Sequence, residues 1–283
     1  MEFLSDARPS PISGTWYAGK ADALSRQMEA FFGAVKLKKE DLPGRVLGLM
    51  VPHAGHRYSG QTAAYGYQAV ADSLRQLVVI LSPLHQFFPD DFVTTAHAAY
   101  QTPLGEVRVA QPELQQLNRL LDESEMALTQ VARDGEHSLE IQLPFLQYLW
   151  KTPFDLLPVM IRTHENSKLE AFSAALQQTI GGMDALVIAS TDLSHFFPHL
   201  TAQMLDAETL RRVRDFNPQA VLEGDFDQSA PACGSGAVAA MLYTTRSMGA
   251  DKVQILNYST SAEATGDESS VVGYGAAAVL KTK

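Results

Sequence analysis

Four continuous runs of apolar residues constrain this chain more than any other feature. They are RVLGLMV at 45–51, LVVILS at 77–82, DLLPVMI at 155–161 and ALVIAS at 185–190. Strands with one solvated face alternate apolar and polar residues, whereas strands covered on both faces read as unbroken apolar runs. The four runs therefore predict buried strands of a parallel sheet that has helices on both sides.

Stretches with helical periodicity separate these strands. Apolar residues recur at helical spacing in 21–36, and further helices are expected at 61–74, 112–122, 138–150, 167–180, 201–214, 217–223 and 234–248. Further strands are expected within 91–110 and at 253–259 and 270–280. Alternation of strands and helices is typical of the α/β class. Because no repeat or Ser/Gly-rich linker interrupts the chain, we expect residues 1–283 to form one domain. It should contain a mostly parallel central sheet flanked by helices.

Composition excludes several classes of protein. The formal net charge is -10, which argues against nucleic acid as the main partner because phosphate binding needs a basic patch. The single cysteine, Cys233, cannot form an internal disulfide, which fits a reducing compartment. No apolar stretch reaches the ~18 residues that a membrane span needs. These features predict a soluble cytoplasmic protein.

Polar residues follow three of the apolar runs. PHAGHRYSG follows the first run, SPLH ends the second, and STDLSHF follows the fourth. Ligands of open α/β sheets bind beyond the carboxyl ends of the strands. If these strands are neighbours, one crevice should collect the side chains of His53, His85, Asp192 and His195.

Cys233 adds a sulfur atom to this set. It lies in APACGSG, just before a predicted helix, and a helix N-terminus favours the thiolate that binds metals. Two imidazoles, from His53 and His85, together with one thiolate suit iron, copper or zinc, whereas magnesium and calcium need oxygen ligands. Three protein ligands leave coordination positions open, as in catalytic metal sites. His195 and Asp192, three residues apart, would form a base and its orienting carboxylate.

Each residue also has an ordinary structural interpretation. A single histidine after a strand is usually a hydrogen-bonded structural residue, a lone cysteine is usually a small buried hydrophobe, and Asp192 could cap the segment after its strand. The joint placement at strand ends favours a functional site. Two further histidines compete as candidates: His56, three residues after His53, and His137, which lies in EHSLE before a predicted helix.

Motifs along nearly the whole chain resemble those of the Memo family, also called the AmmeMemoRadiSam system protein B family. The matching segments, in order, are GTWYAG, PHAGHRYSG, SPLHQ, TPLGEV, EHSLEIQLPFL, STDLSHF, ACGSG, NYSTS and SVVGYGAAA. No single motif is specific, but the ordered set is. The resemblance implies a fold similar to that of the class III extradiol dioxygenases, which use a mononuclear non-haem iron.

The resemblance also implies roles for individual residues. In Memo proteins two histidines and a cysteine line the corresponding pocket, and these fall on His53, His85 and Cys233. The aspartate and histidine of the SSD-x-x-H element fall on Asp192 and His195.

Two more histidines are placed by the same resemblance. The EHS element puts His137 near the pocket, and His56 stands where the family usually has tyrosine.

These residues imply a mononuclear Fe(II) or copper cofactor, with zinc also compatible, and redox or oxygenase-type chemistry on an unidentified substrate. His195, oriented by Asp192, and His137 would move protons. The alternative is a non-enzymatic protein that binds a peptide or small ligand in an inherited pocket. A purely structural metal site is the third interpretation, although structural zinc usually has four protein ligands. The family name implies AMMECR-like and radical-SAM proteins as partners.

Overall fold

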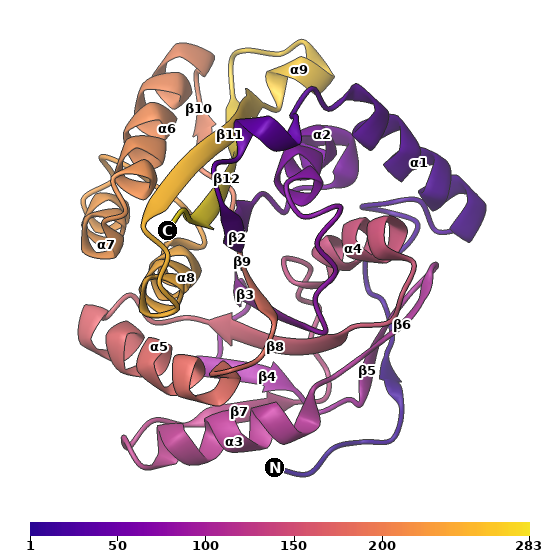
Figure 1. The fold of residues 1–283 in the computed structure, drawn as a ribbon. Coiled ribbons are helices and arrows are strands. Elements are labelled where there is room, and N and C mark those ends of the chain that lie inside the picture. Colours follow the sequence, from indigo (N-terminus) through magenta and orange to yellow (C-terminus); the bar gives the residue numbers. More distant parts are fainter.

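A large mixed sheet forms the centre of the protein (Figure 1). The computed structural model describes residues 1–283 apart from the side chain of Lys39. The strand order is β10-β12-β2-β9-β3-β8-β4-β7, and β11 pairs with β12. The bounds of these strands are β2 (Arg45–Val51), β3 (Leu77–Pro83), β4 (Phe92–Thr95), β7 (Leu128–Val131), β8 (Asp155–Ile161), β9 (Ala185–Ser190), β10 (His195–Phe197), β11 (Lys252–Thr260) and β12 (Val271–Lys281).

The four apolar runs of the sequence are the central strands of this sheet. β2, β9, β3 and β8 lie side by side and all pair in parallel. The predicted parallel sheet is therefore present at the centre, whereas β12 pairs with β2 and β4 pairs with β8 in the antiparallel sense. β11 and β12 are also antiparallel, because a short connection cannot carry the chain back for parallel pairing.

Helices cover both faces of the sheet, as Figure 1 shows. α1, α2 and α4 lie on one side, and α5, α7 and α8 lie on the other. The bounds of the helices are α1 (Ala21–Ala34), α2 (His56–Gln68), α3 (Gln111–Asp122), α4 (Leu143–Trp150), α5 (Asn166–Ile180), α6 (His199–Arg214), α7 (Pro218–Phe226), α8 (Ser235–Ser247) and α9 (Ala262–Thr265), with 3₁₀ turns η1 (Lys39–Asp41) and η2 (Glu140–Gln142). Among the described residues, no helix is both long and apolar enough to cross a bilayer.

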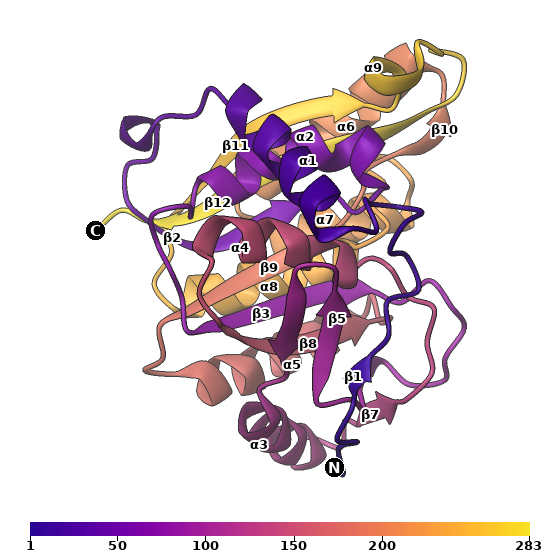
Figure 2. The ribbon, with the colours of Figure 1, turned by 90° about the vertical axis from the view of Figure 1, so that its right-hand side faces the viewer.

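A second, smaller sheet anchors the N-terminal arm. It consists of β1 (Ala7–Arg8), β5 (Ala99–Thr102) and β6 (Gly105–Arg108). β1 pairs in parallel with β5, so that Arg8 lies opposite Tyr100. Figure 2 shows the arm passing beside β5 before the chain reaches α1. Residues 1–20, the N-terminal arm, thus pack along the body of the protein.

The expected helix at 138–150 begins later than predicted. The chain makes the 3₁₀ turn η2 first, and Pro144 lies in the first turn of α4. Proline is well tolerated there because the first N–H groups of a helix have no partner within the helix. The helix therefore needs no kink, and the segment before it is free to carry His137 to the sheet edge.

His56 is part of the core. It is the first residue of α2, and its ring packs against Phe145, Tyr17 and Phe31 at centroid distances of 4.8, 5.4 and 6.2 Å. Its Nε2 lies 3.1 Å from the carbonyl oxygen of Ile141. Because a carbonyl can only accept, Nε2 carries the proton, and Nδ1 has no hydrogen-bond partner among the described residues. Burial lowers the pKa of His56 to about 4.

We expect this histidine to make the metal-free protein less stable in acid. A folded-state pKa of about 4 against an ordinary value of 6.5 means that the unfolded chain binds more protons between these values. The stabilisation is complete above pH 6.5 and is lost as the pH falls towards 4. The free energy of unfolding, measured with urea, should fall between pH 7 and pH 4.5 in both proteins. The fall should be smaller by about 2 kcal/mol in His56→Gln than in the wild type.

The exposed His164 provides a matched control, and His164→Gln should lose as much stability as the wild type. Equal losses for the wild type and His56→Gln would contradict the buried, neutral state of His56.

Candidate metal centre

The three predicted polar clusters meet at one edge of the sheet. His53 follows β2 by two residues, His85 follows β3 by two, and Asp192 follows β9 by two. β9 lies between β2 and β3, and Val51 is in register with Ser190. The carboxyl ends of the three strands therefore lie together, and so do the side chains that follow them.

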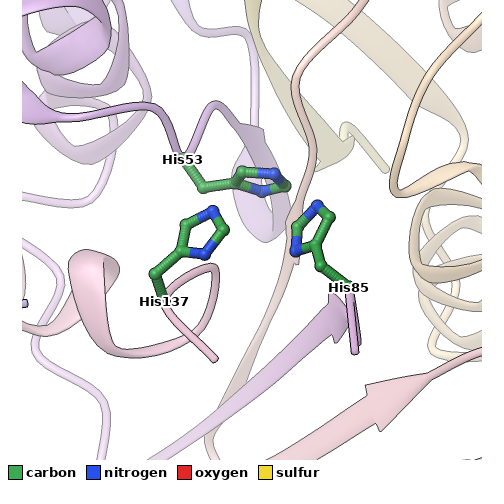
Figure 3. A group of neighbouring side chains, drawn as sticks. All are labelled: His53, His85 and His137. Carbon is green, nitrogen blue, oxygen red and sulfur yellow. The ribbon is translucent and has the colours of Figure 1, made fainter. Parts of the chain in front are cut away.

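His53, His85 and His137 form a compact group at this edge (Figure 3). One ring nitrogen of each lies within 4.8 Å of the other two. The ring centroid of His53 lies 5.3 Å from that of His85 and 5.5 Å from that of His137. The centroids of His85 and His137 are 4.8 Å apart. Three imidazole nitrogens this close together could hold a transition-metal ion.

A buried serine determines the tautomer of His53. The hydroxyl of Ser190 donates its only proton to the carbonyl of Ser138 at 2.6 Å and accepts from the side-chain amide of Gln142 at 2.8 Å. The imidazole of His53 must therefore donate the hydrogen bond of 3.0 Å between its Nδ1 and this hydroxyl. Nδ1 carries the proton, and the lone pair of Nε2 faces the site.

The carboxylate of Glu136 plays the same part for His85. It accepts the backbone N–H groups of His85, His137 and Ser138 at 2.6, 2.8 and 2.9 Å, and it lies 3.0 Å from His85 Nδ1. A carboxylate at neutral pH only accepts, so His85 Nδ1 carries the proton, and in the neutral ring Nε2 is the nitrogen that is free to bind a metal. The same carboxylate lies 3.3 Å from His137 Nδ1.

Burial and this contact shift the two pKa values in opposite directions. Burial raises the pKa of Glu136, but the hydrogen bond and charge of His85 outweigh burial and bring it below its usual range. Burial lowers the pKa of His85, and Glu136 reverses this, so that the pKa of His85 is raised. The carboxylate is thus ionised at neutral pH and ties the imidazole in one orientation.

The thiol of Cys233 contacts His53 at its free nitrogen. Sγ lies 3.2 Å from His53 Nε2 and accepts the backbone N–H of Asp192 at 3.3 Å. Since Nε2 is unprotonated, the S–H group donates to it. Burial raises the pKa of Cys233, and the nearby charge of Asp192 adds to this shift. Burial thus favours the neutral thiol in the metal-free protein, against the expected effect of the helix N-terminus.

A glycine allows this close approach. A Cβ atom at Gly234 would collide with the carbonyl oxygen of Ser190 and would lie 2.8 Å from Thr191 Cβ. The N–H of Gly234 donates to the Thr191 hydroxyl at 2.9 Å. The loop before α8 therefore packs directly on the end of β9, which brings Cys233 to the site.

Asp192 and His195 lie at the site but do not form the predicted pair. Oδ1 of Asp192 accepts the backbone N–H groups of His53 at 2.7 Å and Ala54 at 3.3 Å. Among the described residues, no hydrogen bond joins Asp192 to His195. Burial raises the pKa of Asp192, although its hydrogen bond with His53 opposes the shift. Asp192 positions the turn that carries His53, and His195 lines the cavity separately.

A cavity of about 530 Å³ contains the imidazole group in its wall. Aromatic rings contribute much of its lining, and they belong to Trp16, Tyr58, Phe196 and Tyr274. The ring of Trp16 lies 4.1 Å from that of His137. Phe196 is 75% exposed and has a φ of 64°, which is unusual for a bulky side chain and places a strained residue at the cavity. No lysine or arginine is among the described residues that line it.

The structure brings together most of the residues that the sequence singled out. His53, His85, Asp192, His195 and His137 all line the cavity, and Cys233 lies against His53. His56 lies outside the compact imidazole group.

Sequence reasoning missed the residues that orient these side chains. Glu136 stands beside His137 in the EHSLE motif, where a carboxylate next to a candidate histidine was a usable signal. Ser190 and Trp16 gave no such signal, because their contacts depend on the fold.

Comparison with known proteins identifies the family of this chain. Residues 8–278 match the family model described as "Memo-like protein". A MEMO1 family protein of Methanopyrus kandleri is 33% identical over 277 residues, which cover 95% of this chain and 97% of that protein. One from Nitrosopumilus maritimus is 31% identical over 276 residues, covering 95% of this chain and 98% of that protein.

A solved structure supports the fold alone. The crystal structure of an uncharacterized protein of Escherichia coli covers 82% of this chain and 99% of its own, with a TM-score of 0.52 and 12% sequence identity. The family model and the two relatives each span nearly the whole chain, and the motifs that meet at the sheet edge lie within the matched residues. This chain belongs to the Memo family.

Proposed function

We propose that this protein binds one redox-active transition-metal ion, iron or copper, and uses it in oxygenase-type chemistry on a small molecule in the cavity. The observation that carries the proposal is the group of three imidazoles whose nitrogens lie within 4.8 Å of one another. Two of these rings, His53 and His85, have Nδ1 tied to an acceptor, which leaves Nε2 with a free lone pair. This is the usual arrangement of histidines that bind metals.

His53 and His85 would hold the ion, with Cys233 as the third ligand. Metal–nitrogen and metal–sulfur bonds of about 2.0 and 2.3 Å place two tetrahedral ligand atoms about 3.5 Å apart. The distance of 3.2 Å between Cys233 Sγ and His53 Nε2 is close to that value. Sulfur with two imidazoles favours iron, copper or zinc. His137 is the competing third ligand, since its ring belongs to the compact group.

A bound ion would supply Lewis acidity and a redox couple. The chain's own residues would do the rest. The aromatic rings of Trp16 and Tyr274 would hold the apolar body of a small molecule, and His195 would exchange protons with it from the cavity wall. When Cys233 is the ligand, His137 remains available as a second proton donor.

The second candidate function is binding without catalysis. The cavity favours it as well, because aromatic rings line it and no described lysine or arginine does, which suits an uncharged ligand or peptide side chain. Metal binding separates the two functions: a protein that binds its ligand equally well after the metal ligands are removed uses the cavity for recognition only.

Ligand substitutions should divide into two groups under anaerobic titration with Co(II), Fe(II) or Cu. His53→Ala and His85→Ala should weaken metal binding by more than about 100-fold, because each removes a side chain that binds the ion directly. Cys233→Ser should remove the sulfur-to-metal charge-transfer band, and His137→Gln should retain it. The exposed His164→Gln variant is the control. If His137→Gln abolishes binding and Cys233→Ser does not, the ligand set is three imidazoles.

Metal affinity should rise with pH. Cys233 is a neutral thiol with a raised pKa and must release its proton to bind an ion. His53, with a pKa lowered to about 3 by burial, is already neutral. His85, whose pKa is raised by Glu136, must also lose a proton to bind an ion. We expect the affinity for Zn(II) to increase by at least about tenfold per pH unit between pH 6 and 8, and less steeply in Cys233→Ser. The same pH dependence in both proteins would show that the thiol does not bind the metal.

A further inference from the structure

One buried guanidinium lies against the segment that carries Glu136 and His137. The side chain of Arg8 is 3% exposed and comes from β1, more than a hundred residues earlier in the chain. Nη1 donates to Glu140 at 2.7 Å, Nη2 donates to the carbonyl of Glu136 at 2.8 Å, and Nε donates to Asp134 at 3.1 Å. Arg8 thus contacts the segment before, at and after Glu136.

The charges around Arg8 leave this segment little freedom. The side chains of Asp134 and Glu140 are 4% and 1% exposed, so that two carboxyl groups are buried beside one guanidinium. Glu140 also accepts the hydroxyl of Tyr17 at 2.7 Å. Removing the partner of a buried ion is costly because the remaining charge is uncompensated. The segment is therefore held in place by Arg8 and would shift without it.

A continuous path of hydrogen bonds leads from Arg8 to His85. Asp134 accepts from Arg8 and also from the backbone N–H of Glu136 at 3.1 Å. The carboxylate of Glu136 in turn accepts from the backbone and Nδ1 of His85. The position of that carboxylate, which determines the tautomer of His85, therefore depends on the arm.

His53 is linked to Arg8 less directly. Its Nδ1 donates to Ser190, which is held by Gln142 and by the carbonyl of Ser138. The backbone N–H of Ser138 donates to Glu136, so the path from Arg8 to His53 passes through two more residues than the path to His85. The arm should therefore affect His85 more than His53.

We propose that Arg8 is a positioning residue of this centre, which acts through Asp134 and Glu136 to orient His85 and His137, with a smaller effect on His53. The geometric claim concerns the metal-free protein; only its consequence for metal affinity rests on the proposed function. The N-terminal arm would then be a part of the centre, although its residues lie far from the ligands in the sequence.

The test is the state of the histidine rings in metal-free, ¹⁵N-labelled protein at pH 7.5. Long-range ¹H–¹⁵N spectra report which ring nitrogen carries the proton. Arg8→Lys keeps the charge but loses the fork that reaches three acceptors. We expect the ring signals of His85 and His137 to shift, with His85 losing its Nδ1–H hydrogen bond to Glu136, and those of His53 to shift less. Asp134→Asn, which keeps the contact of Arg8 with Glu140, should shift the ring signals of His85 in the same way. It provides the test if Arg8→Lys does not fold.

Arg75→Lys is the matched control. Arg75 is also a buried arginine, 5% exposed, but it pairs with Asp184 and the carbonyl of Val46 at the opposite edge of the sheet. It should lower stability without moving any of the three rings. Unchanged His85 and His137 signals in both Arg8→Lys and Asp134→Asn would overturn the proposal, and so would a shift of His53 as large as that of His85.

Metal titration separates this proposal from the proposed function. In Arg8→Lys, Co(II) affinity should fall by roughly 10- to 100-fold, the range typical when a residue that orients a metal ligand is lost. If the wild type binds no Co(II) while the rings still shift, the proposed function fails and the role of Arg8 stands. If the wild type binds Co(II) and Arg8→Lys binds it equally with unshifted rings, the role of Arg8 fails alone.

Discussion

The candidate centre depends on two hydrogen-bond acceptors, the hydroxyl of Ser190 and the carboxylate of Glu136. Each one binds Nδ1 of an imidazole and so leaves Nε2 with a free lone pair, on His53 and on His85. Without these acceptors the rings could rotate or exchange tautomers, and proximity alone would not make them ligands. Cys233 then meets His53 at the nitrogen that is left free.

Burial gives the pocket its chemical character. It lowers the pKa of His53 to about 3 and that of His137 to about 4, so both imidazoles are neutral at physiological pH, and neutral imidazole is the form that binds metals. Burial also raises the pKa values of Cys233 and Asp192. Glu136 and His85 are the exceptions, because each stabilises the charge of the other and backbone N–H groups also bind the carboxylate. An ionised carboxylate bound to an imidazole Nδ1 is common where a histidine binds a metal.

The sequence predicted the parts of this structure that depend on local pattern. Four apolar runs became the central strands, and His53 and His85 met because parallel strands end at the same edge of the sheet. The antiparallel pairing of β12 and the contacts of Arg8 depend on how loops return, and no local periodicity encodes this. The predicted pairing of Asp192 with His195 assumed that nearness in sequence gives contact, whereas the carboxylate caps the turn at His53. The thiolate prediction considered the helix and not the desolvation of Cys233.

The most direct test of the account is the position of a bound ion. Crystals loaded anaerobically with Zn(II) or Co(II), measured across the metal absorption edge, should show one anomalous peak about 2.0–2.1 Å from Nε2 of both His53 and His85. A peak bonded to Nδ1 of either ring, or at a place that does not touch both histidines, would contradict the claim that Ser190 and Glu136 prepare these nitrogens for one metal.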